Sequence, residues 1–142
     1  MPDAFPITFY HNPDCGTSRN ALLMVQAAGY APDVVEYRVT GWTRSQLECL
    51  LAAMGTGPRA ILRDKGTPAA ELGLLDPATS DDAILAAMVT HPILVNRPIV
   101  VTPQGTRLCR PSEVVLTLLD HLPETFTKPE TFTKEDGEVV RL

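Results

Sequence analysis

Hydrophobic and polar positions along the chain follow two alternating periods. Residues 7–10 form a short run of β-branched and aromatic side chains, which predicts a strand. Apolar positions then recur at helical spacing from Ala21 to Ala28, and Gly29 is suited to end that helix. A second β-like run covers residues 34–39. The chain therefore opens with a βαβ unit, in which the crossover between parallel strands is almost always right-handed.

Short helical segments follow this unit. Thr43 and Gln46 have the spacing of a capping box, and apolar positions continue at helical spacing to Met54. Residues 60–63 and 68–72 each predict one helical turn, and Ser80-Asp81-Asp82 predicts the start of a further helix. Together these segments, about residues 43–90, are too short to bury a core of their own. We interpret them as a helical insertion rather than as a separate domain.

The β pattern returns after the insertion. Apolar runs at residues 92–95 and 99–102 flank Asn96-Arg97-Pro98, which is typical of a tight turn between neighbouring strands. We expect Pro98 to be a cis proline. A second turn and a short edge strand are predicted over residues 103–110. Pro111-Ser112-Glu113 then opens a helix that extends to Leu119.

The resulting order is βαβ, helical insertion, ββα. It predicts an α/β protein of thioredoxin-like fold, with a small mixed sheet flanked by helices. We expect residues 1–122 to form a single domain of this kind. Residues 123–142 form a tail in which the hexapeptide Pro-Glu-Thr-Phe-Thr-Lys occurs twice in tandem. Six residues are too few for a structural repeat unit, so we interpret the second copy as a local duplication in a peripheral segment.

Composition excludes several classes of protein. The net charge of −5 disfavours a nucleic-acid-binding surface, because it repels phosphate. No apolar run approaches the roughly 20 residues of a membrane span, and the N-terminus lacks the pattern of a signal peptide. The cysteines are an odd and sparse set without a C-x-x-C motif or a cluster of metal ligands: Cys15, Cys49 and Cys109. We therefore expect a cytoplasmic protein with reduced thiols and no bound metal or cofactor.

Cys15 is the candidate nucleophile. It lies between the first strand and the first helix, where unpaired backbone N–H groups and the helix dipole favour a thiolate and also attract an oxyanion. The alternative is a buried and inert thiol, which is the usual state of a free cysteine. Its place at the carboxyl end of a strand, where active sites of α/β proteins gather, favours the catalytic interpretation. We interpret Cys49 as core or near-surface filler and Cys109 as structural. The alternative for Cys109 is a position within reach of Cys15.

Four polar residues near Cys15 in the sequence are candidates to stabilise its thiolate or to bind an anion. A charge or hydrogen bond from His11 would lower the pKa of Cys15. Ser18 would either hydrogen-bond the thiolate or, like Thr17, cap the helix. Arg19 is either an anion ligand or a solvated helix residue. Asn12 either contributes to oxyanion binding or only shapes the turn.

Three arginines from separate segments are candidate anion ligands: Arg63, Arg97 and Arg110. Each alone would most often be a surface charge. Their predicted places at strand ends would allow them to converge on Cys15, and the guanidinium fork suits a tetrahedral oxyanion. Phosphate, arsenate and sulfate all fit this description, so spacing alone does not choose among them.

The segment His11-Asn12-Pro13-Asp14-Cys15-Gly16-Thr17-Ser18-Arg19-Asn20 resembles the active-site segment of the glutaredoxin-coupled arsenate reductases, with the pattern H-x-x-x-C-x-x-x-R. The resemblance continues through residues 59–63, 71–74, 91–103 and 105–113, and its motifs end near residue 119. The duplicated tail departs from the pattern.

The resemblance implies a role for each candidate. Cys15 attacks arsenate, and His11 helps to hold Cys15 as a thiolate. Two residues support the loop: Ser18 and Arg19. Three residues bind the oxyanion and the arsenic intermediates: Arg63, Arg97 and Arg110. Glutathione then attacks the adduct as a co-substrate, the partner glutaredoxin supplies the reducing equivalent, and arsenite leaves, which implies a role in arsenic detoxification and resistance.

Two other functions use the same scaffold. One is a redox-regulatory protein that binds a polymerase, although the absence of C-x-x-C counts against the regulators that carry this switch. The other is a glutaredoxin-type thiol oxidoreductase that acts on glutathione mixed disulfides. An assay with and without arsenate separates these functions from arsenate reduction.

Overall fold

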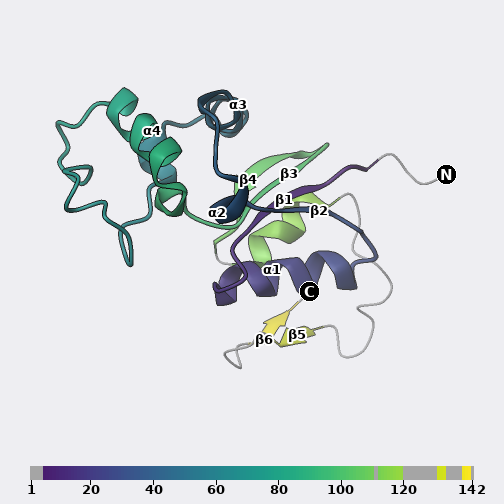
Figure 1. The fold of residues 1–142 in the computed structure, drawn as a ribbon. Coiled ribbons are helices and arrows are strands. Elements are labelled where there is room, and N and C mark those ends of the chain that lie inside the picture. Colours follow the sequence, from purple (N-terminus) through teal and green to yellow (C-terminus); the bar gives the residue numbers. More distant parts are fainter. Residues whose placement is uncertain (1–4, 111, 120–130, 134–138, 142) are drawn as a thin grey trace. The chain divides into compact units, whose positions relative to one another are not determined.

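The computed structural model describes residues 5–110, 112–119, 131–133 and 139–141 (Figure 1). The chain divides into two compact units. The first unit consists of Met1–Glu36 and Arg97–Leu142, and the second of Tyr37–Asn96. The first unit contains the sheet, and the second contains the predicted insertion. No helix among the described residues is both long and apolar enough to cross a membrane.

A four-stranded mixed sheet forms the centre of the first unit. Its strands are β1 (Thr8–His11), β2 (Asp33–Glu36), β3 (Ile99–Thr102) and β4 (Gly105–Leu108), in the spatial order β2-β1-β3-β4. β1 is parallel to β2 and antiparallel to β3, and β3 and β4 form an antiparallel hairpin. The predicted mixed sheet is thus confirmed. The Arg97–Pro98 peptide bond at the start of β3 is cis, as predicted.

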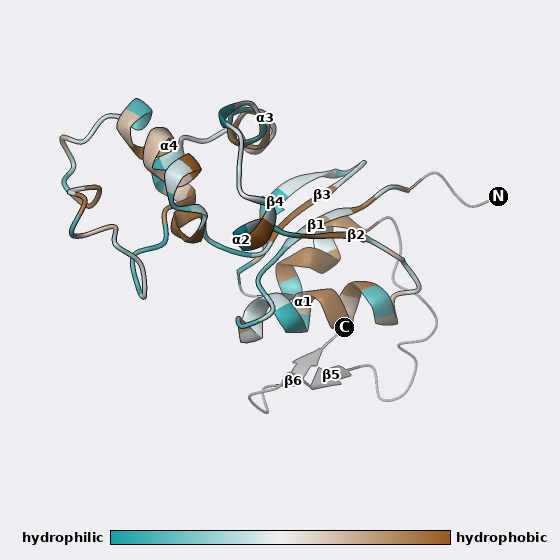
Figure 2. Ribbon diagram, in the orientation of Figure 1, coloured by the Kyte–Doolittle hydropathy of each residue, from teal (hydrophilic) through white to brown (hydrophobic). Residues whose placement is uncertain are grey.

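Two helices, α1 (Gly16–Ala27) and the 3₁₀ helix η3 (Ser112–Leu118), pack against the sheet and against each other. The inward positions of α1 recur at helical spacing at Ala21, Met24 and Val25. In Figure 2 the middle of α1 has the colour of hydrophobic residues. They share a core with Phe9 of β1 and Val100 of β3, which are fully buried. This core fixes the start of α1 relative to the strand ends.

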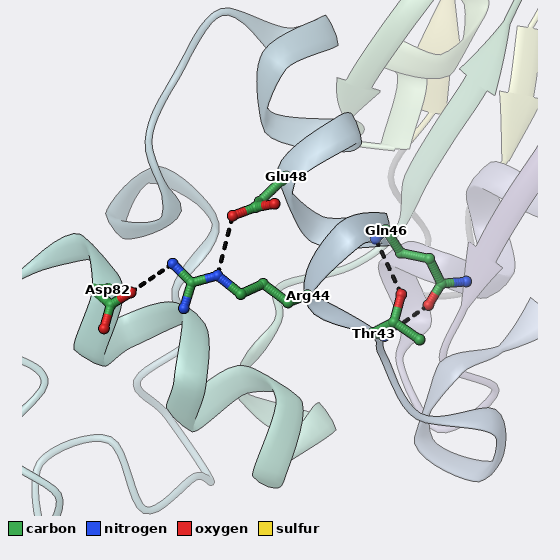
Figure 3. A network of polar contacts seen from close by, with 5 residues as sticks. All are labelled: Thr43, Arg44, Gln46, Glu48 and Asp82. Atoms are coloured by element: carbon green, nitrogen blue, oxygen red, sulfur yellow. Dashed lines mark hydrogen bonds and ion pairs between the residues drawn. The ribbon is translucent and has the colours of Figure 1, made fainter.

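The second unit is mainly helical. Its elements are α2 (Tyr37–Thr40), α3 (Arg44–Met54), η1 (Pro58–Ile61), α4 (Asp81–Thr90) and η2 (Pro92–Leu94). The capping box of α3 is present: Gln46 N–H donates to Thr43 Oγ1 at 3.1 Å, and Thr43 N–H donates to Gln46 Oε1 at 2.9 Å (Figure 3). Ser80 caps α4 by accepting from Ala83 N–H at 3.1 Å. Both predicted helix starts are confirmed.

An exposed ionic network joins α3 to α4. Arg44 Nε contacts Glu48 Oε2 at 3.0 Å within α3, and Arg44 Nη2 contacts Asp82 Oδ1 at 2.6 Å on α4 (Figure 3). The two carboxylates raise the pKa of Arg44. Because all three side chains are exposed, solvent screens these contacts, and they help to orient the helices rather than dominate stability.

Three predicted elements differ from the structure. The strand predicted over residues 34–39 ends at Glu36, because Tyr37 turns into the core of the second unit and begins α2. Residues 92–95 form η2 and one bridge residue, Val95, instead of a strand. Pro92 explains this difference: it lacks the N–H that a ladder needs, and its φ suits the first position of a helix. The closing helix is a 3₁₀ helix over Ser112–Leu118.

The single turns predicted within the insertion form, but they do not extend. The first is shifted to η1. At residues 68–72 one bond, from Leu72 N–H to Pro68 C=O at 2.9 Å, closes a turn. Gly73 then has a φ of +74°, which ends the helical path.

Part of the tail is described. β5 (Thr131–Thr133) pairs antiparallel with β6 (Val139–Arg141). β5 lies in the second copy of the hexapeptide, and the first copy lies outside the described residues. The prediction of a peripheral tail concerns mostly residues outside the described ranges.

Candidate active site

Cys15 is the N-cap residue of α1. Its backbone is extended, with φ −104° and ψ 121°, and its carbonyl accepts from Arg19 N–H at 2.9 Å as the first bond of the helix. The prediction that Thr17 or Ser18 caps the helix is therefore wrong. The chain reaches this position through a tight turn, in which Cys15 N–H donates to Asn12 C=O at 3.0 Å. The reactive sulfur thus belongs to the residue at which the helix begins.

Hydrogen bonds to its own backbone hold the loop before α1. Asn12 Oδ1 accepts from Asp14 N–H at 2.9 Å, which is the bond of an Asx turn. Arg19 Nη1 donates to Pro13 C=O at 2.7 Å. The Oδ1 atom of Asn12 therefore shapes the turn, which is one of the two roles predicted for this residue. Arg19 supports the loop from the first turn of the helix.

A buried polar pair lies beneath the loop. His11 Nδ1 and Ser18 Oγ are 2.6 Å apart, and the same Oγ accepts from Asn12 N–H at 3.1 Å. Ser18 has no exposed surface, and His11 is 8% exposed. The hydroxyl of Ser18 is thus engaged with His11 and the loop backbone, and it neither caps α1 nor bonds the sulfur. His11 acts on the loop through Ser18.

Two of the three predicted arginines lie beside Cys15. Arg110 Nη1 is 3.7 Å from Cys15 Sγ, and it also donates to Arg97 C=O at 3.0 Å. Arg110 follows β4 closely, and Arg97 immediately precedes the cis proline that leads into β3. The hairpin therefore brings the two predicted strand-end positions to the N-terminus of α1.

The surroundings of Cys15 favour its thiolate. Burial raises the pKa of the thiol, but the Ser18 backbone N–H, the charge of Arg97, and hydrogen bonds from Arg110 and Arg97 together lower the pKa below its ordinary value. Ser18 is the N3 residue of α1, so its N–H is one of the unpaired donors of the first turn. A nucleophile and cationic anion donors are thus combined in one place.

Arg63 lies in the second unit, and its convergence on Cys15 stays a prediction. Within that unit its backbone is held on both sides: Arg63 N–H donates to Leu94 C=O at 2.7 Å, and Thr67 Oγ1 donates to Arg63 C=O at 2.8 Å. The half-buried Arg63 therefore starts from a fixed main-chain position.

The other two cysteines differ from Cys15. Cys109 is fully buried in the core of the first unit, and burial raises its pKa to about 12, so it is a poor nucleophile at neutral pH. Cys49 is exposed on α3. All three thiols are free, and the neighbours of Cys15 lower its pKa.

One main-chain group at the site was missed by reasoning from the sequence. The backbone N–H groups at the helix start were predicted to favour the thiolate, and the N–H of Ser18, at N3, is one of them. The Arg97 carbonyl, which anchors Arg110, was not predicted. No sequence signal indicates it, because it depends on how the hairpin folds.

The sheet order and the cysteine at the start of α1 define a protein of thioredoxin-like fold. The chain belongs to the ArsC family, whose model matches residues 10–118. It is 59% identical over 134 residues to arsenate reductase ArsI2 of Synechocystis sp., covering 94% of this chain and 92% of that protein. It is 52% identical over 134 residues to the arsenate reductase of Escherichia coli K12, with the same two coverages.

A solved structure agrees with the family assignment. An arsenate reductase from Vibrio cholerae has a TM-score of 0.78 and 41% identity to this chain, covering 82% of this chain and 100% of that one. The sequence alignments also reach beyond the family model. Because they cover 94% of the chain, the similarity extends past residue 118 into the tail.

Proposed function

We propose that this protein is an arsenate reductase in which Cys15 is the nucleophile, glutathione a co-substrate and glutaredoxin the partner that supplies reducing equivalents. The relatives named above are arsenate reductases, and they match nearly the whole chain. The observation that carries the proposal is the contact of Arg110 with Cys15, at 3.7 Å, at a sulfur whose pKa is lowered. This is a thiolate placed beside a donor for an anion.

Electrostatics explain why arginines are needed. A thiolate that approaches an oxyanion meets a like charge, and guanidinium groups offset this repulsion and bind the oxyanion in a forked geometry. Arg97 and Arg110 occupy suitable positions beside Cys15, and we assign Arg63 the third position. The first-turn N–H groups of α1 add further donors.

In the proposed reaction Cys15, glutathione and glutaredoxin act on arsenate in turn. The Cys15 thiolate attacks arsenic, and one arsenate oxygen leaves as water. The glutathione thiol then displaces a second oxygen as water, so that arsenic carries two sulfur ligands. A glutaredoxin thiolate attacks the glutathione sulfur, and the sulfur–arsenic electron pair stays on arsenic, which becomes As(III). Water finally displaces Cys15 from arsenic and releases arsenite together with the thiolate.

The protein side chains contribute charge and position to these steps. The arginines stabilise the charge that develops as oxygen leaves arsenic. The three free cysteines and the lowered pKa of Cys15 suit this scheme, because an external thiol has to resolve the adduct. The scheme requires reduced glutathione, and we therefore place the protein in a reducing cytoplasm.

A coupled assay tests the function. NADPH consumption is followed with glutathione reductase, glutathione and glutaredoxin, with and without arsenate. We expect consumption that depends on arsenate in the wild type and none in Cys15→Ser, whereas Cys49→Ser retains the rate. A glutaredoxin-type oxidoreductase would instead consume NADPH at the same rate with and without arsenate, and only when a glutathione mixed disulfide is supplied. No turnover with either substrate would contradict an enzyme of this class.

A further inference from the structure

Besides the bond from Val95 N–H to Pro92 C=O at the end of η2, three hydrogen bonds hold the segment that leads into Arg97, and all of them lie within the second unit. Leu94 C=O accepts from Arg63 N–H at 2.7 Å, and Asn96 N–H donates to Ile61 C=O at 2.7 Å. These two bonds form the isolated bridge between Leu62 and Val95. The bridge leaves the carbonyl of Val95 itself without a main-chain partner, and a side chain supplies the third bond.

That side chain is Tyr37. Its phenol donates to Val95 C=O at 2.9 Å across 58 positions of sequence. Tyr37 is 1% exposed, and its ring lies 5.1 Å from the ring of Trp42. Tyr37 is the first residue of the second unit, and Val95 is the residue before its last. The bond therefore joins the two points at which the chain enters and leaves this unit.

We propose that Tyr37 is a positioning residue for Arg97, because its phenol holds the Val95 carbonyl two residues before Arg97. This inference rests on the proposed function in that it assigns Arg97 to the reacting site. Arg97 contributes to that site through its guanidinium and through its carbonyl, which anchors Arg110. A shift of its main chain would therefore weaken both arginine contacts with Cys15.

Loss of the phenol hydroxyl has a defined physical effect. Tyr37→Phe keeps the ring and its packing on Trp42, but it leaves the buried carbonyl of Val95 without its donor. A buried carbonyl without a partner is unfavourable, so the segment shifts to reach water or another donor. The main chain at Arg97 shifts with it. The arginines then lower the pKa of Cys15 less, so this pKa rises.

The experiment measures Cys15 directly and does not depend on arsenate. All variants carry Cys49→Ser, so that the exposed thiol does not react. The rate of Cys15 alkylation by iodoacetamide is followed against pH by mass spectrometry, at a temperature at which circular dichroism shows each variant folded. We expect Tyr37→Phe to move the midpoint upward by about half a pKa unit, which is about threefold slower alkylation below the midpoint.

Two control variants separate positioning from loss of stability. Thr43→Ala removes the capping box of α3 and destabilises the same unit without touching residues 94–96. Tyr30→Phe removes a hydroxyl from a ring that packs on Phe5 in the first unit. We expect both to keep the wild-type midpoint. A midpoint shift in Thr43→Ala equal to that in Tyr37→Phe would overturn the inference, because stability alone would then explain it.

A double-mutant cycle with Arg97→Gln completes the test. If Tyr37 acts through Arg97, Tyr37→Phe shifts the midpoint less when Arg97→Gln is present, because the guanidinium is already lost and only the effect through the Arg97 carbonyl on Arg110 remains. An unchanged midpoint in Tyr37→Phe, or an equal shift with and without Arg97→Gln, would overturn the positioning role. Failure of the proposed function is distinguished from this result. In that case the wild type would not turn over arsenate, but the alkylation midpoints of all variants could still be measured.

Discussion

Arg110 contacts Cys15 with the same nitrogen that holds Arg97. Its Nη1 atom lies 3.7 Å from Cys15 Sγ and 3.0 Å from the carbonyl oxygen of Arg97. The two arginines therefore form one unit around the sulfur: one is placed by the main chain of the other. Each should affect the thiolate both by its own charge and by the position of its neighbour.

Removal of Arg110 should raise the pKa of Cys15. In Arg110→Ala the sulfur loses a hydrogen bond and a nearby cation, so we expect the midpoint of alkylation to rise by about one unit. The thiolate is present above its pKa, and the acid limb of the activity profile should move to higher pH by the same amount. Arg107→Ala is a matched control, because exposed Arg107 contacts Thr117. An unchanged acid limb in Arg110→Ala would remove Arg110 from the site.

Lysine should not replace arginine at position 97. Arg97→Lys keeps the charge but lacks the planar fork that binds two oxygens of a tetrahedral anion. We expect arsenate reduction to fall by about a hundredfold, comparable to the loss of one preorganised donor. Arg44→Lys on the exposed α3–α4 network should retain the wild-type rate in the same assay. A wild-type rate in Arg97→Lys would show that the fork is not used.

The hydroxyl of Ser18 should matter for stability more than for the sulfur. Ser18→Ala leaves His11 and the Asn12 N–H without their shared buried partner, which should reduce the free energy of unfolding by about 1–3 kcal/mol. The Ser18 backbone N–H remains, so the pKa of Cys15 should stay below its ordinary value. Urea unfolding and pH-dependent alkylation measure the two effects separately, with exposed Ser45→Ala as the control. A large rise in the Cys15 pKa at wild-type stability would contradict this division.

Cys109 should make the protein less stable at alkaline pH. Its pKa is about 12 in the folded protein against an ordinary value near 9, so between these values the unfolded chain loses this proton and the folded chain keeps it. The stabilisation is complete below pH 9 and is lost as the pH rises toward 12. At pH 10 the loss is about 1.4 kcal/mol.

Cys109→Ala removes this dependence. The free energy of unfolding of each protein is measured in urea at pH 7 and at pH 10. The wild type minus the variant should be smaller at pH 10 than at pH 7, by about 1.4 kcal/mol. Other groups titrate in both proteins and cancel in the comparison. A constant difference between the wild type and Cys109→Ala would mean that the buried thiol ionises normally.

Local patterns in the sequence predicted much of this molecule. The capping box at Thr43, the helix start at Ser80 and the cis peptide before Pro98 each depend on residues close in sequence, and all three were predicted. The mixed sheet followed from the order of the elements. Cys15, Arg97 and Arg110 also lie together as predicted, because strand ends and helix starts meet at one edge of the sheet.

The elements that were not predicted depend on tertiary contacts. Tyr37 has high strand propensity, yet its buried phenol bonds Val95, and the chain turns into α2. The hydroxyl of Ser18 was expected to act at the helix start or on the sulfur, but it is turned toward buried His11. Neither contact leaves a signal in the spacing of apolar residues, since each joins polar atoms across an interior that forms only on folding.

Because Cys15 is the N-cap of α1, its sulfur is covalently part of the helix start. Chemical modification of this atom sets the charge that faces the first-turn N–H groups. Neutral alkylation removes the thiolate charge there, whereas an anionic adduct restores or increases it. The melting temperature of the intact protein can thus serve as a label-free record of the state of the sulfur, and it would distinguish neutral from anionic adducts without any substrate turnover.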